Sequence, residues 1–291
     1  MSQKAMSQSV LPVAFQGVPG AYSHQACAEV FPGREAMACD TFEAAIAAVR
    51  EGQAGHAMLP VENSTYGRVA DIHHLLPESG LHIIGEHFLR VHINLLAPQG
   101  ARLEDIRTAM SHTVLLGQCR AFLRAHKLAT RVGADTAGSA EIVAQEGDPT
   151  QAALASEFAA QIYGLDVLAR HIEDQSNNTT RFLVMAPSPN PSPAAPAVTT
   201  FVFRVRNLPA ALYKALGGFA TNGVNITKLE SYMVGGLFTA TQFYADVEGR
   251  PEDPNVARAL DELTYFTSSL QILGVYPANP FRRSNYGSGG I

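Results

Sequence analysis

The chain has 291 residues, of which 46% are hydrophobic and 16% are charged, and its formal net charge is −5. This length is enough for two ordinary domains, and this composition excludes an intrinsically disordered chain. There is no basic field that would attract a nucleic-acid backbone, so we expect no nucleic-acid partner. No segment reaches about 18 uninterrupted apolar residues and no apolar leader opens the chain, so we expect a cytoplasmic protein that does not enter a membrane.

Cysteine and histidine usage gives no sign of metal or disulfide chemistry. Cys27, Cys39 and Cys119 are odd in number and lack the spacing of metal ligands, so we expect three reduced thiols. His73 and His74 are adjacent and cannot share one helix face. Neither a Walker loop nor a dinucleotide-binding glycine motif follows the first expected strand. We therefore predict no metal and no cofactor.

Short apolar runs alternate with helical patterns at the start of the chain. We predict strands at residues 13–16 and 56–61, and helices at 21–30, 41–51 and 69–76, with Thr41 as the cap of the second helix. This alternation is typical of a mostly parallel α/β sheet with helices on both faces.

A long alternating pattern at residues 81–98 predicts a strand that crosses between two lobes. The elements expected beyond it are a strand at 109–111, helices at 114–126, from 135 and at 152–163, and strands at 167–172 and 182–185. A chain that leaves one α/β lobe, builds a second at about residues 90–165 and then returns encloses a cleft.

Five prolines lie between Pro187 and Pro196, and neither a helix nor a central strand can run through them. We therefore place a linker at 187–197, between a first domain of residues 1–186 and a second of residues 198–280. The second domain is expected to contain strands at 198–205, 224–232, 237–247 and 270–275, and helices at 209–221 and 255–263.

This order of elements, βαββαβ, predicts a ferredoxin-like domain. A sheet of this size has an open edge, which favours pairing with a second copy of the chain. The polar and glycine-rich residues 281–291 are expected to form a flexible tail.

Two polar clusters follow expected strands of the first domain. Gly17 and Gly20 precede a helix, where free backbone amides could hold an anion, although such turns are also common as plain connections. Glu62, Asn63 and Ser64 follow a buried strand and offer an acid–base group, an amide and a hydroxyl. The alternative is that Asn63 or Ser64 only caps a helix.

Two further clusters lie later in the first domain. Asp135 precedes a helix and either caps it or marks a helix N-terminus that holds a carboxylate. The polar run 177–181 leads directly into an apolar strand. Arg181 in that run is suited to a bidentate grip on a carboxylate, or it is an ordinary surface arginine beside an exposed turn.

In this order, the clusters resemble the prephenate dehydratase family. The matching stretches are GVPGAYSHQA, LPVENSTYGRV, the pair Ser111-His112, GQCRAFL, DTAGSA, and YGLDVLARHIED ahead of NNTTRFLV. The later stretch NLPAALYKALGGFATNGVNITKLES resembles an ACT domain. The resemblance covers about residues 13–280. It implies a catalytic region of two lobes similar to type II periplasmic binding proteins, followed by the ACT domain.

The resemblance implies that the chain converts prephenate to phenylpyruvate, carbon dioxide and water in phenylalanine biosynthesis. Thr180 would assist departure of the ring hydroxyl, Arg181 would grip a substrate carboxylate, and Glu62 is the alternative acid. The expected substrate-binding residues are Ser23, Asn63, Ser64, Asn178, Thr179 and Phe182. Two alternatives stay open, an arogenate dehydratase and an anion-binding protein without catalysis.

The ACT resemblance implies L-phenylalanine as effector and a homodimer or homotetramer. The expected effector contacts are Ala211, Leu212, Asn225, Ile226, Glu230 and Ser231. Three motifs depart from the family. His-Pro-Gln is His112-Thr113-Val114 here, and Gly-Ala-Leu is Ala210-Ala211-Leu212. Glu-Ser-Arg-Pro continues after Ser231 as Tyr232-Met233, which removes an arginine and a proline from the effector-binding region.

Overall fold

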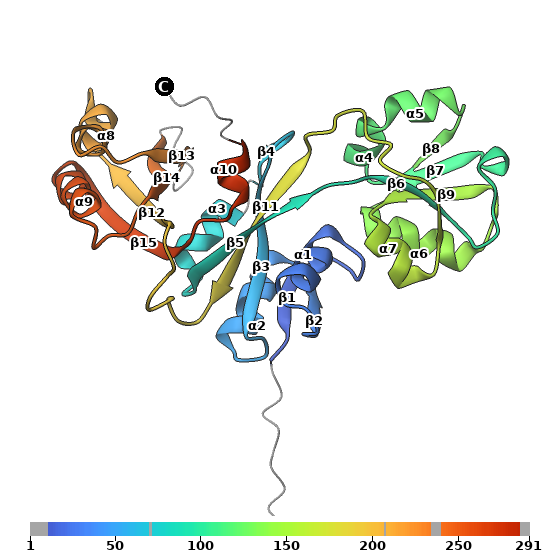
Figure 1. The fold of residues 1–291 in the computed structure, drawn as a ribbon, viewed down its shortest axis with the longest axis horizontal. Helices are drawn as coiled ribbons and strands as arrows, with labels where there is room; N and C mark the ends of the chain where they lie inside the picture. Colours follow the sequence, from blue (N-terminus) through green and yellow to red (C-terminus); the bar gives the residue numbers. More distant parts are fainter. Residues whose placement is uncertain (1–10, 70–71, 207, 234–239, 286–291) are drawn as a thin grey trace, which may run out of the picture. The chain divides into compact units, whose positions relative to one another are not determined.

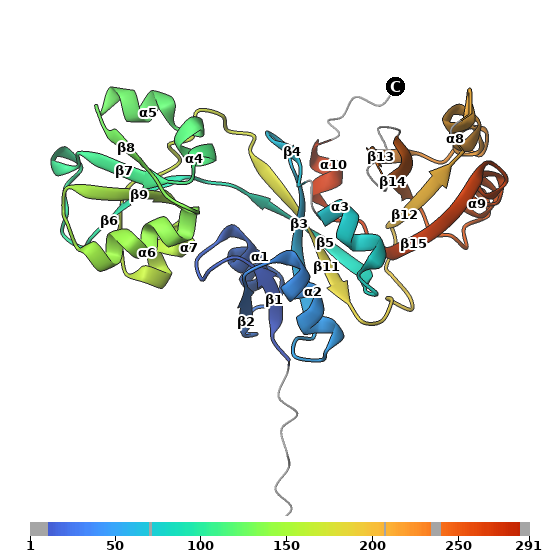
Figure 2. The same ribbon diagram turned by 180° about the vertical axis from the view of Figure 1, so that it is seen from behind.

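The computed structural model describes residues 11–69, 72–206, 208–233 and 240–285. They form two compact units, the first from Met1–Val69 and Phe88–Phe182 and the second from Ala70–His87 and Leu183–Ile291. The chain passes between the units along β5 (His82–Arg90) and β11 (Thr179–Ala186), as Figures 1 and 2 show from opposite sides. The division differs from the expected domains, because residues 70–87 belong with the C-terminal unit. No helix within the described ranges is long and apolar enough to cross a membrane.

The first lobe of the first unit is a small sheet in which the first three strands are parallel and the short fourth strand is antiparallel to the third. Its elements are β1 (Val13–Gln16), α1 (Tyr22–Val30), β2 (Ala36–Cys39), α2 (Phe42–Arg50), β3 (His56–Asn63) and β4 (Gly67–Arg68). Strand β1 lies between β2 and β3 and is parallel to both. The cap of α2 is confirmed, because Thr41 Oγ1 accepts a hydrogen bond from the Ala44 amide at 3.1 Å. Strand β2 was not predicted.

The second lobe is a five-stranded sheet in the order β10-β6-β9-β7-β8. Its strands are β6 (Asn94–Ala97), β7 (Thr108–Ser111), β8 (Ala129–Val132), β9 (Gln151–Ala155) and β10 (Asp166–Ala169). Its helices are η2 (Leu103–Asp105), α4 (Thr113–Gln118), α5 (Arg120–Ala125), α6 (Thr136–Glu146) and α7 (Glu157–Tyr163). Apolar cores cover both faces of the sheet, one beneath α4 and α5 and the other beneath α6 and α7. The expected second α/β lobe is thus confirmed.

Three element predictions in this lobe need correction. The helix expected at 152–163 is wrong, because 151–155 is the buried strand β9 and only 157–163 is helical. The alanine-rich run favours a helix locally, but its place between β6 and β7 decides the outcome. The expected strand 81–98 is interrupted at 91–93, and the expected helix 114–126 is divided at Cys119.

The second unit contains the predicted βαββαβ fold. Its elements are β12 (Ala197–Val205), α8 (Ala211–Thr221), β13 (Ile226–Met233), β14 (Ala240–Glu248), α9 (Pro254–Phe266) and β15 (Thr267–Pro277). The strand order is β13-β14-β12-β15, and α8 and α9 cover one face. Strand β15 also pairs with β5 at Ile83. Part of the expected helix 69–76 is present as α3 (Ile72–Leu75), which continues into η1 (Leu76–Glu78), whereas residues 70 and 71 lie outside the described ranges.

The C-terminal residues that were expected to be flexible begin with a helix, α10 (Phe281–Asn285). Arg282 donates to both carboxylate oxygens of Glu86, at 2.6 and 2.8 Å, and to Asp246 at 3.1 Å. The side chains of Glu86 and Asp246 are both fully buried. The tail prediction is therefore wrong for 281–285, because two buried carboxylates require this cation.

Candidate active site

Three amide side chains and one threonine form a hydrogen-bonded chain where β3 ends and β11 begins. Asn63 Nδ2 donates to Asn178 Oδ1 at 2.6 Å and to Thr180 Oγ1 at 3.0 Å. Asn178 Nδ2 donates in turn to Gln118 Oε1 at 3.2 Å. Gln118 is the last residue of α4, so this series of hydrogen bonds joins the two lobes of the first unit.

The backbone fixes the direction of every hydrogen bond in this chain. Asn63 Oδ1 accepts from the backbone amides of Thr65 and Tyr66 at 2.9 and 3.0 Å, so the other end of the side chain must be the NH2 group. Thr180 Oγ1 therefore accepts a hydrogen bond from Asn63. The hydroxyl proton of Thr180 is not used in this contact and can be donated elsewhere.

The sequence alone indicated no role for Gln118. The only signal was a polar residue at the end of an otherwise apolar helix, within the stretch GQCRAFL. Its contact with Asn178 joins residues 60 positions apart in the chain, and that pairing depends on how the second lobe folds back.

Ser64 and Thr179 clamp the two strand ends together. Ser64 Oγ donates to the Asn177 carbonyl at 2.6 Å and accepts from the Thr179 amide at 2.9 Å. The Ser64 amide also donates to the Thr179 carbonyl at 2.9 Å. Arg90 Nη1 donates to Thr179 Oγ1 at 3.4 Å. Ser64 was expected at the substrate, and these bonds commit its side chain to the backbone instead.

Glu62 and Arg181 form an ion pair, with Arg181 Nη1 at 2.8 Å from Glu62 Oε1. The Arg181 side chain is 3% exposed and that of Glu62 is 29% exposed. The Arg181 guanidinium also lies 5.9 Å from the centre of the Phe88 ring. The Glu62 carboxylate is therefore committed to Arg181 and does not lie beside the Thr180 hydroxyl, where an alternative acid would be needed.

The three expected catalytic side chains do not converge on one face of the sheet. Ser64 is opposite Thr179, Asn63 contacts Thr180, and Glu62 contacts Arg181. Neighbouring side chains along a strand point to opposite faces. The Thr180 hydroxyl therefore lies on one face, together with the amide of Asn63, and the ion pair lies on the other.

The turn before α1 packs against the second lobe. The Tyr163 hydroxyl donates to the Pro19 carbonyl at 2.7 Å, and a Cβ on Gly20, whose φ is +84°, would lie 3.2 Å from the Cα of Ala159. The Gly20 amide already donates to His24 Nδ1 at 3.0 Å, so the expected anion-binding amide is in use. Burial lowers the pKa of His24. Ser23, an expected substrate contact, is 9% exposed in α1.

Two other predicted residues have local structural roles. Asp135 caps α6, because its Oδ1 accepts from the Gly138 amide at 2.6 Å, which confirms the capping alternative. Phe182 is 1% exposed and lies within the core of the sheet.

The cysteines are free thiols, as predicted, and Cys27 and Cys119 are buried. Burial raises the pKa of each of these two thiols to about 12, which makes them unreactive near neutral pH. Among the described residues, no group of three His, Cys, Asp or Glu side chains is arranged to hold a metal ion.

The expected effector residues divide between the two faces of the second unit's sheet. Ala211, Leu212 and Ile226 pack against the core beneath α8 and α9. Ser231 is opposite Phe243 of the same core, whereas Glu230 is opposite Tyr244 on the other face. The sheet therefore separates Glu230 from the α8 side.

Two of the expected effector residues and the adjacent Tyr232 make contacts of their own. Glu230 accepts from Lys228 Nζ at 3.3 Å, and Asn225 Nδ2 donates to Glu248 at 3.2 Å. Tyr232 is 4% exposed, and its hydroxyl accepts a hydrogen bond from Gln242. The tyrosine that replaces the family's arginine is thus a buried side chain on the face opposite to α8.

Comparisons with known proteins identify the family to which the chain is similar. Residues 13–190 match the prephenate dehydratase family model. A bifunctional N-acyl-homoserine lactone acylase/prephenate dehydratase of Komagataeibacter europaeus is 53% identical, over 93% of this chain and 97% of its own length. The arogenate dehydratase/prephenate dehydratase 2 of Arabidopsis thaliana is 38% identical, over 96% of this chain and 76% of its own.

Solved structures lead to the same family. The prephenate dehydratase of Arthrobacter aurescens, determined in complex with L-Phe, is 30% identical, with a TM-score of 0.82 over 92% of this chain and 90% of its own. The chain therefore belongs to the prephenate dehydratase family and is an enzyme, which sets aside the purely anion-binding protein that the sequence had left open.

Proposed function

We propose that the chain acts on prephenate, converting it to phenylpyruvate, carbon dioxide and water without a cofactor, in phenylalanine biosynthesis. The observation that carries this proposal is the Thr180 hydroxyl, whose oxygen accepts from Asn63 and whose proton can still be donated. A donor of this kind suits the departing ring hydroxyl of prephenate.

The reaction breaks two bonds. The bond between the ring and its carboxylate breaks, carbon dioxide leaves, and the electron pair enters the ring. The bond to the ring hydroxyl breaks at the opposite position, and the oxygen leaves with an added proton as water. Formation of the aromatic ring supplies the driving force, so the protein mainly needs to orient the substrate and stabilise the leaving oxygen.

Thr180 donates a hydrogen bond to the leaving oxygen in this proposal. Threonine is a weak acid, so any proton that it transfers must be replaced from solvent, which makes it a relay rather than a reservoir. The Asn63 NH2 group stabilises the negative charge that develops on Thr180 Oγ1 during transfer.

Arg181 stays the proposed partner of a substrate carboxylate, on two conditions. Its guanidinium is buried in the pair with Glu62 on the face opposite to the Thr180 hydroxyl, so one substrate can reach both groups only if Glu62 gives way and the Arg181 side chain turns toward the Thr180 face. Arg181→Lys keeps the charge but loses the bidentate geometry, and we expect a raised KM with a smaller change in kcat. If KM of the Arg181→Lys variant is unchanged, Arg181 pairs only with Glu62 and does not bind the substrate.

Thr180→Ala tests the central role. We expect it to lower kcat at least about a hundredfold, the usual effect of losing an acid–base or oxyanion donor, whereas Thr180→Ser should keep most of the activity. Phenylpyruvate absorbance measures turnover, and thermal unfolding checks the fold. A folded Thr180→Ala enzyme with near-normal turnover would remove Thr180 from the mechanism.

The same preparation separates the two possible substrates. Arogenate carries an amino group in place of the keto group, so its dehydration gives phenylalanine instead of phenylpyruvate. We expect a higher kcat/KM with prephenate. A higher kcat/KM with arogenate would identify an arogenate dehydratase.

We infer that L-phenylalanine regulates the enzyme through the βαββαβ domain of a homodimer or homotetramer. The fold of this domain, the position of Ala211 and Leu212 at the start of α8, and the Arthrobacter relative in complex with L-Phe support this inference. Calorimetry and an activity titration with millimolar phenylalanine test it. If calorimetry shows no heat of binding and the titration shows no inhibition, the domain has only a structural role.

A second candidate activity is hydrolysis of N-acyl-homoserine lactones, favoured by the 53% identity to the bifunctional Komagataeibacter enzyme. Water would add across the amide bond and release a fatty acid and homoserine lactone. Chromatography of these products would detect it. Their absence under conditions where prephenate turns over would exclude this activity.

A further inference from the structure

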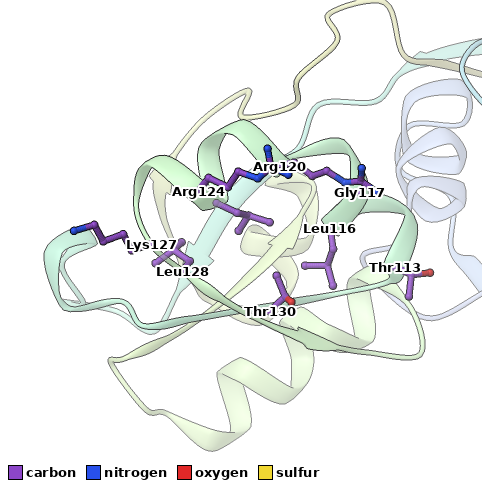
Figure 3. A pocket seen from close by; sticks show the side chains of 9 residues that line it. Thr113, Leu116, Gly117, Arg120, Arg124, Lys127, Leu128 and Thr130 are labelled. Carbon is purple, nitrogen blue, oxygen red and sulfur yellow. The ribbon is translucent and has the colours of Figure 1, made fainter.

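A pocket of about 450 Å³ lies in the second lobe, between α4, α5 and β8 (Figure 3). Leu116, Leu123 and Leu128 line it, and each is less than 10% exposed because it also belongs to the core beneath these helices. The pocket therefore presents apolar surface that is held in place by the lobe itself.

Three cations line the same pocket: Arg120, Arg124 and Lys127. Arg120 and Arg124 are four residues apart in α5 and therefore lie on one side of this helix, and Figure 3 shows both on the same side of the pocket, whereas Lys127 follows the end of the helix. No carboxylate is among the lining residues. Within the described part of the chain, none of the three cations forms an ion pair.

The acidic side chain of Asp174, which contacts the start of α5, has another role. The two carboxylate oxygens of Asp174 accept from the backbone amides of Arg120 and Ala121, each at 3.1 Å. They hold the start of α5 and do not pair with the side chains of the pocket. The pocket therefore combines positive charge with an apolar wall.

We propose that this pocket binds a small organic anion with an apolar body. The anionic group would contact Arg120 and Arg124, Lys127 would add positive charge nearby, and the apolar body would cover the leucines. The volume is within the roughly 300–1,000 Å³ of small-molecule sites. An inorganic anion would leave the apolar wall exposed to water, and a neutral molecule would leave three cations without a partner.

The occupied pocket acts on turnover through α4. Gly117 lines the pocket, and the next residue, Gln118, accepts from Asn178 in the active site. Asp174 ties this segment to the start of α5, because its amide donates to the Gln118 carbonyl at 2.7 Å. A ligand that contacts Gly117 and Arg120 therefore touches the residues on both sides of Gln118, and its binding changes kcat.

Octanoate is a suitable probe, since it joins a carboxylate to an apolar chain, and inorganic phosphate is the probe of charge alone. Calorimetry on the full chain should show saturable binding of one octanoate per chain at this pocket. Phosphate should bind at least about tenfold more weakly. Equal binding of phosphate, or no saturable binding of octanoate, would overturn the proposal.

Three variants assign the binding to this pocket. Arg124→Glu reverses one cation and should weaken octanoate binding at least about tenfold, and Thr130→Phe should fill the pocket from β8 and abolish binding. Arg102→Glu is the matched control, because Arg102 is exposed in the same lobe and does not line the pocket. Equal weakening in all three variants, or in none, would overturn the assignment.

Turnover of prephenate provides the second readout. Saturating octanoate should change kcat of the unmodified enzyme and leave kcat of the folded Thr130→Phe variant unaffected. If octanoate binds the pocket and kcat stays the same, the connection to Gln118 is wrong. If octanoate changes kcat equally in both proteins, the effect comes from another site and this proposal fails.

Discussion

The two ends of the Asn63 side chain make different hydrogen bonds, one end to the turn after β3 and the other to the candidate site. The substitution Asn63→Asp changes only the second set, so it separates the two roles. The oxygen end accepts from the amides of Thr65 and Tyr66, and a carboxylate can do the same. The nitrogen end donates to Asn178 and Thr180, and a carboxylate cannot. The Thr180 hydroxyl then has an acceptor beside it, so its proton turns toward the new carboxylate and away from the substrate.

The size of the effect follows from these contacts. Loss of one preorganised donor costs about 10²–10³ in kcat, which is roughly 3–4 kcal/mol of transition-state stabilisation. The Asn178 side chain, in a residue that is 4% exposed, also loses its donor, which destabilises the fold by about 1–3 kcal/mol. The turn after β3 keeps its acceptor, so the protein should still fold.

Single-turnover formation of phenylpyruvate, with enzyme in excess, measures the chemical step, and thermal unfolding measures stability. Asn63→Ala is the comparison, because it also removes the donor but introduces no acceptor for the Thr180 proton. We expect kcat to fall further in Asn63→Asp than in Asn63→Ala. Turnover of Asn63→Asp within about tenfold of the unmodified enzyme, or above that of Asn63→Ala, would refute the assigned direction of the hydrogen bonds.

Three further predictions address the rest of the structure. Gln118→Met keeps the size of the side chain but removes the acceptor for Asn178, so kcat should fall about tenfold while KM changes less. A kcat equal to that of the unmodified enzyme would contradict the role of the hydrogen-bonded amides. In urea unfolding, Arg282→Met should cost about 3–5 kcal/mol, because two buried carboxylates lose their cation, whereas the exposed Arg283→Met should stay within about 0.5 kcal/mol. Burial lowers the pKa of His24 below its ordinary 6.5, so the native state binds fewer protons than the unfolded state and stability falls as pH drops through about 6.5; His24→Asn should flatten this part of the profile, and an unchanged slope would exclude His24 as its source.

Elements with strong local signals were predictable from the sequence. The cap at Thr41 and the βαββαβ order of the second unit were confirmed, because a capping side chain and an amphipathic period act within a few residues. The run Gln151–Ala155 was not predictable, because its alanines favour a helix and only the neighbouring strands make it a strand. Arg282 was missed for a related reason. Its carboxylate partners are 196 and 36 residues away in the chain.

The candidate site was predictable as a set of residues but not as an arrangement. Asn63, Asn178 and Thr180 were all predicted, and the structure brings them into one hydrogen-bonded chain. The register between β3 and β11 decides which side chains share a face, and no local pattern encodes that register. For this reason Glu62 and Arg181 were grouped with Thr180, although the register pairs them on the other face.

The hydrogen bond from Asn63 to Thr180 explains how a weakly acidic hydroxyl would suit the doubly charged substrate proposed above. Backbone amides fix Asn63, and Asn63 fixes Thr180, so orientation rather than acidity makes the threonine useful. A carboxylic acid beside the leaving group would be a stronger donor, but its ionised form would repel the two carboxylates of prephenate. Glu62 avoids this repulsion because Arg181 cancels its charge at 2.8 Å and the pair lies on the face opposite to the Thr180 hydroxyl. In the proposed reaction on prephenate, a neutral donor held by neutral amides would thus assist the departing hydroxyl without opposing the binding of a dianion.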